Sequence, residues 1–408
     1  MATTTHKRSS SILSPPGVPA LLASSILARL PLAMFGIELL VHAQRLTGSF
    51  AVAGLVSGAY AIARALAAPF VGRLVDRCGQ TVVLLCASGL SALLLVAAGL
   101  LPAGAPSPLL VALAAGIGLS SPPLAACVRT LLPAVLSDPD ALPAAYAFES
   151  TALELTFIFG PPLALGLGVL WSTGAALALS GLVMFAATLA FGAQPASRRW
   201  RPDRNATRPR GGSLRSPAIR TLVLVLVCTG AVFGAVDVGV TAAATQLGST
   251  AAAGPLLGLW GVGSLLGGVA ATRLGGGARR ARGLTMLLIA VALGHAALIV
   301  TTGSALAIGA VLVVAGASIA PTFASIYAMV DRAAPAGART EAFAWPMTAS
   351  STGGSAGAAA AGALVQSAGA PAALAVAAVA GMLAVLIALL GSRSLDDTAS
   401  VPALAVAV

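Results

Sequence analysis

The stretch from Cys78 to Val128, CGQTVVLLCASGLSALLLVAAGLLPAGAPSPLLVALAAGIGLSSPPLAACV, contains no Asp, Glu, Lys or Arg over 51 residues. A helix needs about 20 consecutive apolar residues to cross the hydrocarbon core of a bilayer. The stretch is therefore long enough for two such helices. Prolines and a glycine between Pro102 and Pro108 interrupt it near the middle and predict a tight turn there.

Four further runs repeat this pattern. Three of them lack Asp, Glu, Lys and Arg, and the fourth contains only Asp237. Each has room for two spans of about 20 residues, with a turn signal near its middle. The runs are 155–197, 221–272, 283–330 and 342–392. With two more helices expected at 18–43 and 50–71, the sequence predicts an all-α, polytopic membrane protein with twelve transmembrane helices.

The composition excludes a soluble globular protein. Of the 408 residues, 58% are hydrophobic and 9% are charged, whereas soluble domains carry about 25% charged residues. The net charge of +11 does not indicate a nucleic-acid partner, because the arginines lie in short clusters between apolar runs. The four cysteines have neither metal-ligand nor disulfide spacing. We therefore expect no metal and no other cofactor.

The distribution of arginine predicts the orientation in the membrane. Alternate loops carry the basic residues, and the remaining loops carry Arg45 and almost nothing else. Because basic loops stay in the cytoplasm, we expect both termini to be cytoplasmic. The Ala-, Gly- and Arg-rich composition is typical of a bacterium with a GC-rich genome, so the inner membrane is the expected location. The apolar run that begins at Val18 exceeds a signal-peptide core of about 7–15 residues, and we interpret it as the first span.

The two halves of the sequence are similar at an offset of 200 residues. The matched residues are Ala53, Gly54, Gly58 and Arg73 in the first half and Ala253, Gly254, Gly258 and Arg273 in the second. Such a repeat predicts two six-helix bundles around a central cleft. The expected domains are a cytoplasmic tail (1–17), the first bundle (18–194), a cytoplasmic linker (195–217), the second bundle (218–392) and a cytoplasmic tail (393–408).

The segment from Gly72 to Gln80, GRLVDRCGQ, resembles the loop motif of the major facilitator superfamily, Gly-x-Leu-x-Asp-Arg-x-Gly-Arg. Spacing and position match, and only the final Arg is replaced, by Gln80. The resemblance implies that family's fold of two pseudo-symmetric six-helix bundles. It also implies a conformational role for Gly72, Asp76, Arg77 and Gly79. In the family this loop contacts helix eleven and helps to hold the outward-open state.

The same resemblance indicates what the motif would contact here. Gly72 would let two helices approach closely, and Asp76 could accept hydrogen bonds at a helix N-terminus. Helix eleven is expected to begin near Glu341, so either Glu341 or Arg77 would complete the charge network.

A second resemblance lies in the expected fifth span. Gly160-Pro161 resembles the Gly-Pro motif in helix five of the family's drug/proton antiporters and implies a bend there. Ala152 and Thr156 stand where that motif has further glycines, so a kink without a role in antiport is an equal interpretation. Overall, the chain most resembles bacterial exporters of drugs or natural products.

Carboxyl groups inside the spans are candidates for proton coupling, because a charge at the bilayer centre costs about 2.5–3.5 kcal/mol and needs a reason to be there. A proton-coupled carrier needs a carboxyl group that binds and releases protons, and burial favours the protonated form. The candidates, in order, are Glu154, Asp237 and Glu38. We expect Glu38 and Asp237 to face the cleft from pseudo-equivalent helices.

The intramembrane arginines receive three different interpretations. Arg129 and Glu149 are expected to form a structural ion pair near the cytoplasmic face. Arg29 and Glu38 are nine residues apart, and at about 100° per residue they point to opposite sides of their helix. Arg29 is therefore a cleft candidate that counters another carboxylate or binds an anionic substrate. Arg64 is expected to extend to the membrane surface.

Two tryptophans complete the candidate site. Trp260 and Trp345 could line the cleft and contact substrate, although core packing explains them equally well. His295, in the expected ninth helix, is interpreted as a packed side chain.

The sequence favours a secondary transporter that works by alternating access, with proton-coupled efflux of a small amphipathic organic molecule such as a drug or natural product. Its expected partners are that cargo, protons and the lipid bilayer, and it is expected to act as a monomer. The alternative is an importer or facilitator of a sugar or another metabolite on the same fold. A membrane-embedded enzyme or lipid-handling protein is disfavoured, because none of the three histidines lies in a catalytic motif.

Overall fold

The computed structural model describes residues 17–136, 138, 141–201, 212–249 and 252–397. Most of the two expected tails and part of the expected linker lie outside the described residues. Within them the structure is built from helices. The first half of the chain forms α1 (Val18–Thr47), α2 (Phe50–Cys78), α3 (Gln80–Gly99), α4 (Ser107–Leu119), α5 (Leu124–Val135), α6 (Leu142–Leu170), α7 (Thr173–Ala193) and α8 (Pro195–Arg199).

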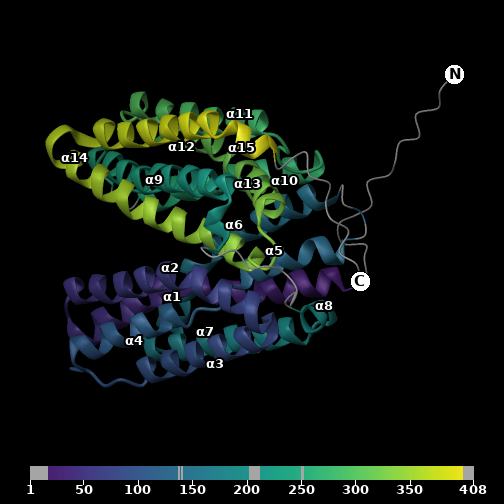
Figure 1. Cartoon of the computed structure of the whole chain (residues 1–408). Helices are drawn as coiled ribbons and strands as arrows, with labels where there is room; N and C mark the ends of the chain where they lie inside the picture. The colour runs from purple at the N-terminus through teal and green to yellow at the C-terminus, as the bar shows by residue number, and fades with distance from the viewer. Residues whose placement is uncertain (1–16, 137, 139–140, 202–211, 250–251, 398–408) are drawn as a thin grey trace.

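The second half forms α9 (Pro217–Gln246), α10 (Ala253–Arg273), α11 (Ala281–Ala296), α12 (Ala305–Gly316), α13 (Ile319–Ala333), α14 (Arg339–Leu390) and α15 (Ser392–Asp397). Short 3-10 turns at Gly212–Arg215 and Ala297–Val300 precede α9 and follow α11. We call α1 to α8 the first lobe and α9 to α15 the second lobe. Figure 1 shows α1, α2, α3, α4 and α7 of the first lobe below the green and yellow helices of the second lobe, with α5 and α6 between the two groups.

Eleven helical segments among the described residues are long and apolar enough to cross a membrane. Two of these spans contain a break in the helix: α4 and α5 together form one, and α12 and α13 another. The expected helices eleven and twelve are continuous in α14, which is 52 residues long and kinks at Gly369, where φ is +75°. Glycine tolerates this left-handed conformation, and the kink falls within the turn expected at 368–371. The arm before the kink is rich in Ala, Gly and Ser and is not among the eleven.

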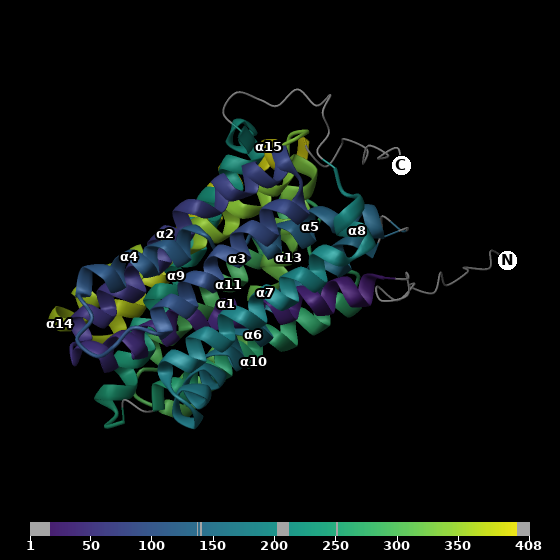
Figure 2. The same cartoon turned by 90° about the horizontal axis from the view of Figure 1, so that it is seen from below.

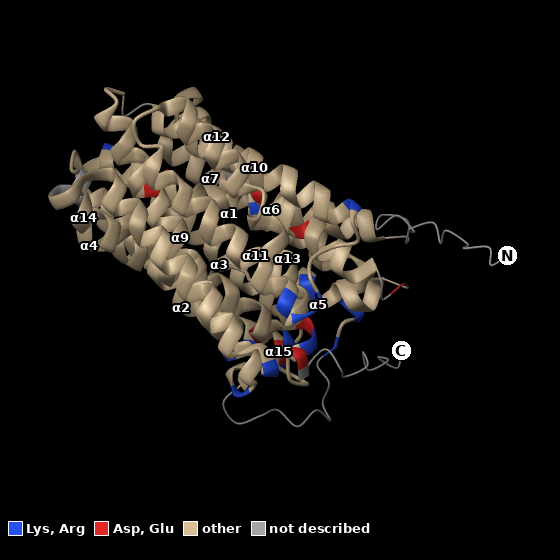
Figure 3. Ribbon diagram, turned by 90° about the horizontal axis from the view of Figure 1, so that it is seen from above, with Lys and Arg blue, Asp and Glu red and all other residues tan. Residues whose placement is uncertain are grey.

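The long helices run in a common direction (Figure 2), and the charged residues gather at one end of the bundle, around α5 and α15 (Figure 3). We call this the arginine-rich end. Leucines and other large apolar side chains are exposed along the helices; Leu66 and Leu90, for example, are 60% and 51% exposed. A surface of this kind suits contact with lipid, which cannot solvate polar groups.

Candidate functional site

A close contact between α2 and α14 joins the two lobes at the arginine-rich end. Asp76, in the last turn of α2, accepts hydrogen bonds from the backbone N–H groups of Thr340 (3.0 Å) and Glu341 (2.9 Å), in the first turn of α14. These N–H groups have no acceptor within their own helix, and the helix dipole favours a negative charge there. Gly72 lies one turn earlier, and a Cβ atom there would be only 3.0 Å from Glu341 Cα. Glycine thus permits the approach that Asp76 stabilises.

Glu341 extends this contact into a network, which we call the interlobe lock. Its carboxylate accepts hydrogen bonds from Arg73 Nε and Nη2, both at 3.0 Å, and from the backbone N–H of Ser213 at 3.2 Å. The network therefore uses Glu341, one of the two partners left open by the sequence, together with Arg73. Arg77 is exposed, and Gly79 caps the end of α2 with φ at +98°.

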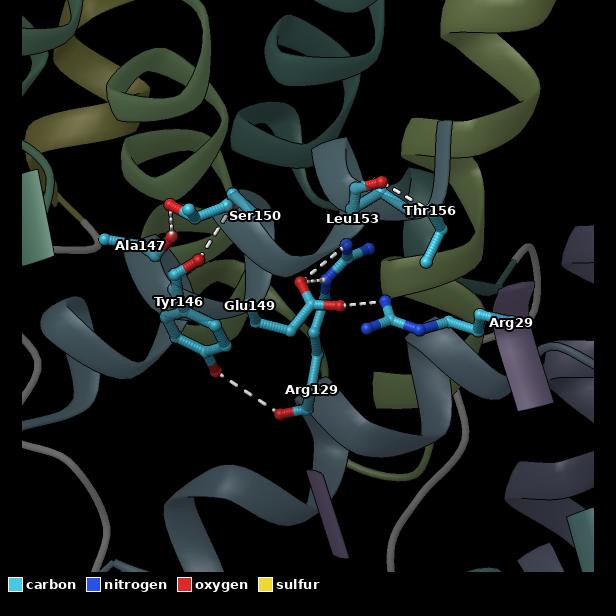
Figure 4. Close-up of polar contacts among 9 residues, drawn as sticks. Arg29, Arg129, Tyr146, Ala147, Glu149, Ser150, Leu153 and Thr156 are labelled. Atoms are coloured by element: carbon cyan, nitrogen blue, oxygen red, sulfur yellow. Dashed lines mark hydrogen bonds and ion pairs between the residues drawn. The ribbon is translucent and has the colours of Figure 1, made fainter. Parts of the chain in front are cut away.

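Three charged side chains from helices of the first lobe form a buried cluster (Figure 4). Arg129 of α5 contacts Glu149 of α6 as expected, with Nε donating to Oε2 at 2.7 Å. The other carboxylate oxygen accepts a hydrogen bond from Arg29 of α1. All three side chains are at most 4% exposed. Glu149 thus holds two guanidinium groups together, and the cluster carries one more positive than negative charge.

A cavity of about 70 Å³ lies beside this cluster. Arg29 and Arg129 line it, and so does Arg64 of α2, which sequence reasoning assigned to the membrane surface. The rest of the lining comes from α1, α2, α5, α6, the break between α4 and α5, and α14 of the second lobe, so the cavity lies where the lobes meet. Its apolar lining includes Leu32, Ala33, Ala68, Leu153, Phe343 and Met347.

A chain of aromatic rings leads from the cluster into the second lobe. The guanidinium carbon of Arg129 lies 3.5 Å from the ring centre of Tyr327 on α13. Tyr327 packs on Phe323, which packs on Phe233, with ring centres 5.9 and 6.1 Å apart. Trp260 follows at 5.2 Å from Phe233. The sequence contains these aromatic residues on separate segments, but their alignment with Arg129 depends on how the two lobes pack.

Neither candidate tryptophan lines the cavity. Trp260 donates a hydrogen bond from Nε1 to Nε2 of His295 at 3.0 Å, and His295 is fully buried, as expected for a packed histidine. Trp345 is partly buried on α14, and its indole N–H has no hydrogen-bond partner among the described residues.

The three carboxyl candidates lie in different surroundings. Glu154 is half-buried on α6 and lies beside Ser264 of α10, across the boundary between the lobes. Asp237 is exposed on α9. Glu38 accepts a hydrogen bond from Ser180 of α7 at 2.7 Å and is 4% exposed. Glu38 therefore points into the interior of the first lobe and not toward the cleft, contrary to expectation. Arg29, on the opposite side of the same helix, lines the cavity.

The helix-five motif provides a close packing site. Pro161 and Pro162 lie within the continuous helix α6. A Cβ atom at Gly160 would be 3.1 Å from the Cβ atom of Ala33 on α1. Glycine at this position thus lets α6 pack tightly on α1, near the cavity. Elsewhere, no group of three or more His, Cys, Asp or Glu side chains in the described part of the chain could hold a metal ion.

Comparisons with known proteins agree with this architecture. The model of the family described as Major Facilitator Superfamily matches residues 21–358. A search of curated proteins finds no match. Among solved structures, a bacterial homologue of the iron transporter ferroportin in the outward-facing state is 19% identical, with a TM-score of 0.73, and the match covers 92% of this chain and 99% of that one.

Two further structures show the same fold. The human organic anion transporter MFSD10 (TETRAN) is 18% identical, with a TM-score of 0.71, and the match covers 92% of this chain and all of that one, 100%. The proton:xylose symporter XylE, bound to 6-bromo-6-deoxy-D-glucose, is 13% identical with a TM-score of 0.71; the match covers 91% of this chain and 94% of that one. At these identities the likeness establishes the fold alone.

Proposed function

This chain belongs to the major facilitator superfamily of membrane transporters, and we propose that it exports a small amphipathic organic molecule in exchange for protons. In this proposal the arginine-rich end and both termini face the cytoplasm of a bacterium, and the protein works as a monomer in the inner membrane. We further propose that the bundles which move against each other are residues 18–194 and 218–392, and that the linker 195–217, which includes α8, joins them.

The interlobe lock is the observation that carries the proposal. Asp76 binds the first turn of α14 and Arg73 binds Glu341, so the two lobes are held together at the arginine-rich end. The interlobe lock consists of a few hydrogen bonds and ion pairs around Gly72, so its contacts can form and break together. Rocking of the lobes would break them and open this end, which is the motion that alternating access requires.

Glu154 supports the proton-coupled step. It lies where α6 meets α10, so rocking of the lobes changes its surroundings. Among the described residues Glu154 forms no ion pair with arginine, in contrast to Glu149. A carboxyl group that no cation neutralises favours its protonated form when water is excluded, and it releases the proton when water enters. Proton binding and the change of state are therefore linked at this residue.

The cavity supports an amphipathic cargo. Its lining combines arginines with aliphatic and aromatic side chains and, among the described residues, contains no Asn, Gln or Trp. Sugar sites rely on amide and indole groups that hydrogen-bond hydroxyls, so the importer alternative has less support.

The test is proton-coupled flux in proteoliposomes. Wild type, Glu154→Gln and Asp237→Asn would be reconstituted with a pH gradient and a panel of fluorescent amphiphiles with anionic, neutral and cationic headgroups. Glu38→Gln is the matched control, because Glu38 is buried within one lobe. We expect proton movement that depends on cargo, that is lost in Glu154→Gln and that persists in Glu38→Gln. Cargo movement without proton flux, unchanged in Glu154→Gln, would instead indicate a facilitator.

A further inference from the structure

The cavity between the lobes has an excess of positive charge. Three arginines line it, and Glu149 neutralises one of those charges, which leaves a net charge of +2 from Arg29, Arg64, Arg129 and Glu149. We propose that this cavity binds the anionic headgroup of the cargo, so that the transported molecule is an amphipathic organic anion. The inference rests on the proposed function, which leaves the charge of the cargo open.

Arg64 gives the strongest support for an anion site. Its side chain is partly buried, it lines the cavity, and none of the described ion pairs includes it. A cation held at the depth of the bilayer is costly unless an anion or a polar partner lies beside it. An arginine on a lipid-facing surface would extend to the headgroups, but Arg64 lines the same cavity as Arg29 and Arg129. An anion in the cavity would supply its counter-charge.

Arg29 adds an unused donor. The side chain is 4% exposed, one terminal nitrogen donates to Glu149, and Nε has no hydrogen-bond partner among the described residues. Buried N–H donors are normally paired, because an unpaired one costs about 1–3 kcal/mol. Arg29 therefore brings an incompletely paired cation to the cavity, and an anion there would stabilise it without displacing Glu149.

Arg129 is held in a fixed orientation. It is 2% exposed, its guanidinium lies over the ring of Tyr327, and Glu149 accepts its hydrogen bond at 2.7 Å. A guanidinium that is already oriented loses little further freedom when it binds an anion, and its planar fork matches carboxylate, sulfonate or phosphate oxygens. The same carboxylate cannot neutralise Arg29 and Arg129 completely, so positive charge remains for a ligand.

The size of the cavity limits this site to a headgroup. At about 70 Å³ it is much smaller than the roughly 300–1,000 Å³ of pockets that enclose a whole small molecule. Leu32, Phe343 and Met347 provide apolar surface next to the arginines. A cargo would thus place its charged group among the arginines and its apolar body against these side chains.

The test is equilibrium binding to the purified full-length protein in phosphatidylcholine nanodiscs. The probes are 1-naphthoate, 1-naphthylmethanol and 1-naphthylmethylammonium, which share an apolar body and differ in charge. We expect 1-naphthoate to bind about tenfold or more tightly than the other two, since a charge-assisted hydrogen bond contributes about 1.5–3 kcal/mol. Arg64→Gln should lose about tenfold in naphthoate affinity, and Arg64→Lys should retain most of it. Arg220→Gln, which removes an exposed arginine on α9, should bind as the wild type does.

Three outcomes would overturn the inference. One is equal binding of the neutral or cationic probe, and another is unchanged naphthoate binding in Arg64→Gln. The third is a phospholipid headgroup as the occupant: phosphatidylglycerol in the nanodiscs would then abolish naphthoate binding and co-purify with wild type but not with Arg64→Gln. Because binding is measured without transport, its failure leaves proton exchange untouched. Conversely, binding without cargo-dependent proton flux would contradict only the proposed function.

Discussion

The carboxylate of Asp76 at the end of α2 caps the first turn of α14, where it accepts the backbone N–H of Glu341 at 2.9 Å. The two residues are 265 positions apart, and one carboxylate in one lobe thus satisfies an N–H group that its own helix leaves unpaired. Because Asp76 and Glu341 belong to different lobes, the contact exists only while the lobes are close together at this end. The cap reports directly on the state of the transporter.

Asp76→Asn should weaken the interlobe lock. The amide removes the negative charge and one of the two acceptors, at an expected cost of about 1.5–3 kcal/mol to the closed contact. Hydrogen exchange of the peptide that contains Thr340 and Glu341 should accelerate by about tenfold or more. Arg77→Gln, which changes the exposed neighbour, should leave that exchange as it is. Equal exchange rates in Asp76→Asn and wild type would contradict a role for this cap.

Two glycines on α2 should respond in opposite directions to alanine. A Cβ atom at Gly72 would lie 3.0 Å from Glu341 Cα, 3.1 Å from Thr340 O and 3.2 Å from Ala344 Cβ, so Gly72→Ala pushes the lobes apart. Overpacking of this kind costs about 1–3 kcal/mol. No atom lies within 4 Å of the corresponding position at Gly54, and Gly54→Ala should stabilise the helix by up to about 1 kcal/mol. Thermal unfolding in one detergent tests both; a fall in stability at Gly54, or none at Gly72, would be inconsistent with the structure.

Glu149→Gln should be among the most destabilising of conservative changes. It leaves Arg29 and Arg129 buried without their shared counter-charge, and removal of one partner from a buried ion pair costs about 3–5 kcal/mol. Glu38→Gln is the comparison, because Ser180 is the hydrogen-bond donor to Glu38 and a glutamine oxygen can accept the same bond. Denaturant unfolding of both variants measures the difference. If an anion occupies the cavity, 1-naphthoate should restore part of the stability lost in Glu149→Gln, and equal stability of the two variants would argue against the shared role of Glu149.

Sequence reasoning could locate the helices because a span needs a minimum length of apolar residues, and the kink at Gly369 fell where glycine and proline interrupt such a run. It could also pair Asp76 with the start of α14, because a family motif carried that contact. Helix geometry could also have predicted that Arg73, and not Arg77, joins this network. Arg73 lies three residues before Asp76, and at about 100° per residue the two side chains share one face of the helix.

The cluster of Arg29, Arg129 and Glu149 could be predicted from the sequence only in part. Arg129 and Glu149 are 20 positions apart on adjacent helices, so their pairing could be guessed. Arg29 and Glu149 are 120 positions apart, and their contact depends on how α1 and α6 rotate and pack, which one sequence does not specify. The same rotation turns Glu38 into the first lobe. It also leaves Arg64 at the cavity, where no local pattern distinguishes it from an arginine at the membrane surface.

The dependence of transport on membrane potential should reveal how proton and cargo are coupled. If one monovalent anion leaves for each proton that enters, every cycle moves two positive charges inward, each worth about 2.3 kcal/mol per 100 mV. With no pH gradient, a tenfold gradient of 1-naphthoate should then be balanced by about 30 mV, because a tenfold ratio corresponds to about 59 mV for one charge and half of that for two. The measurement is the potential, set with potassium and valinomycin, at which net naphthoate flux through the reconstituted protein stops. A value near 59 mV would indicate that the anion moves alone, and flux that no potential can stop would indicate that proton and anion travel together. A value near 30 mV is the one that exchange of an anionic cargo for a proton requires.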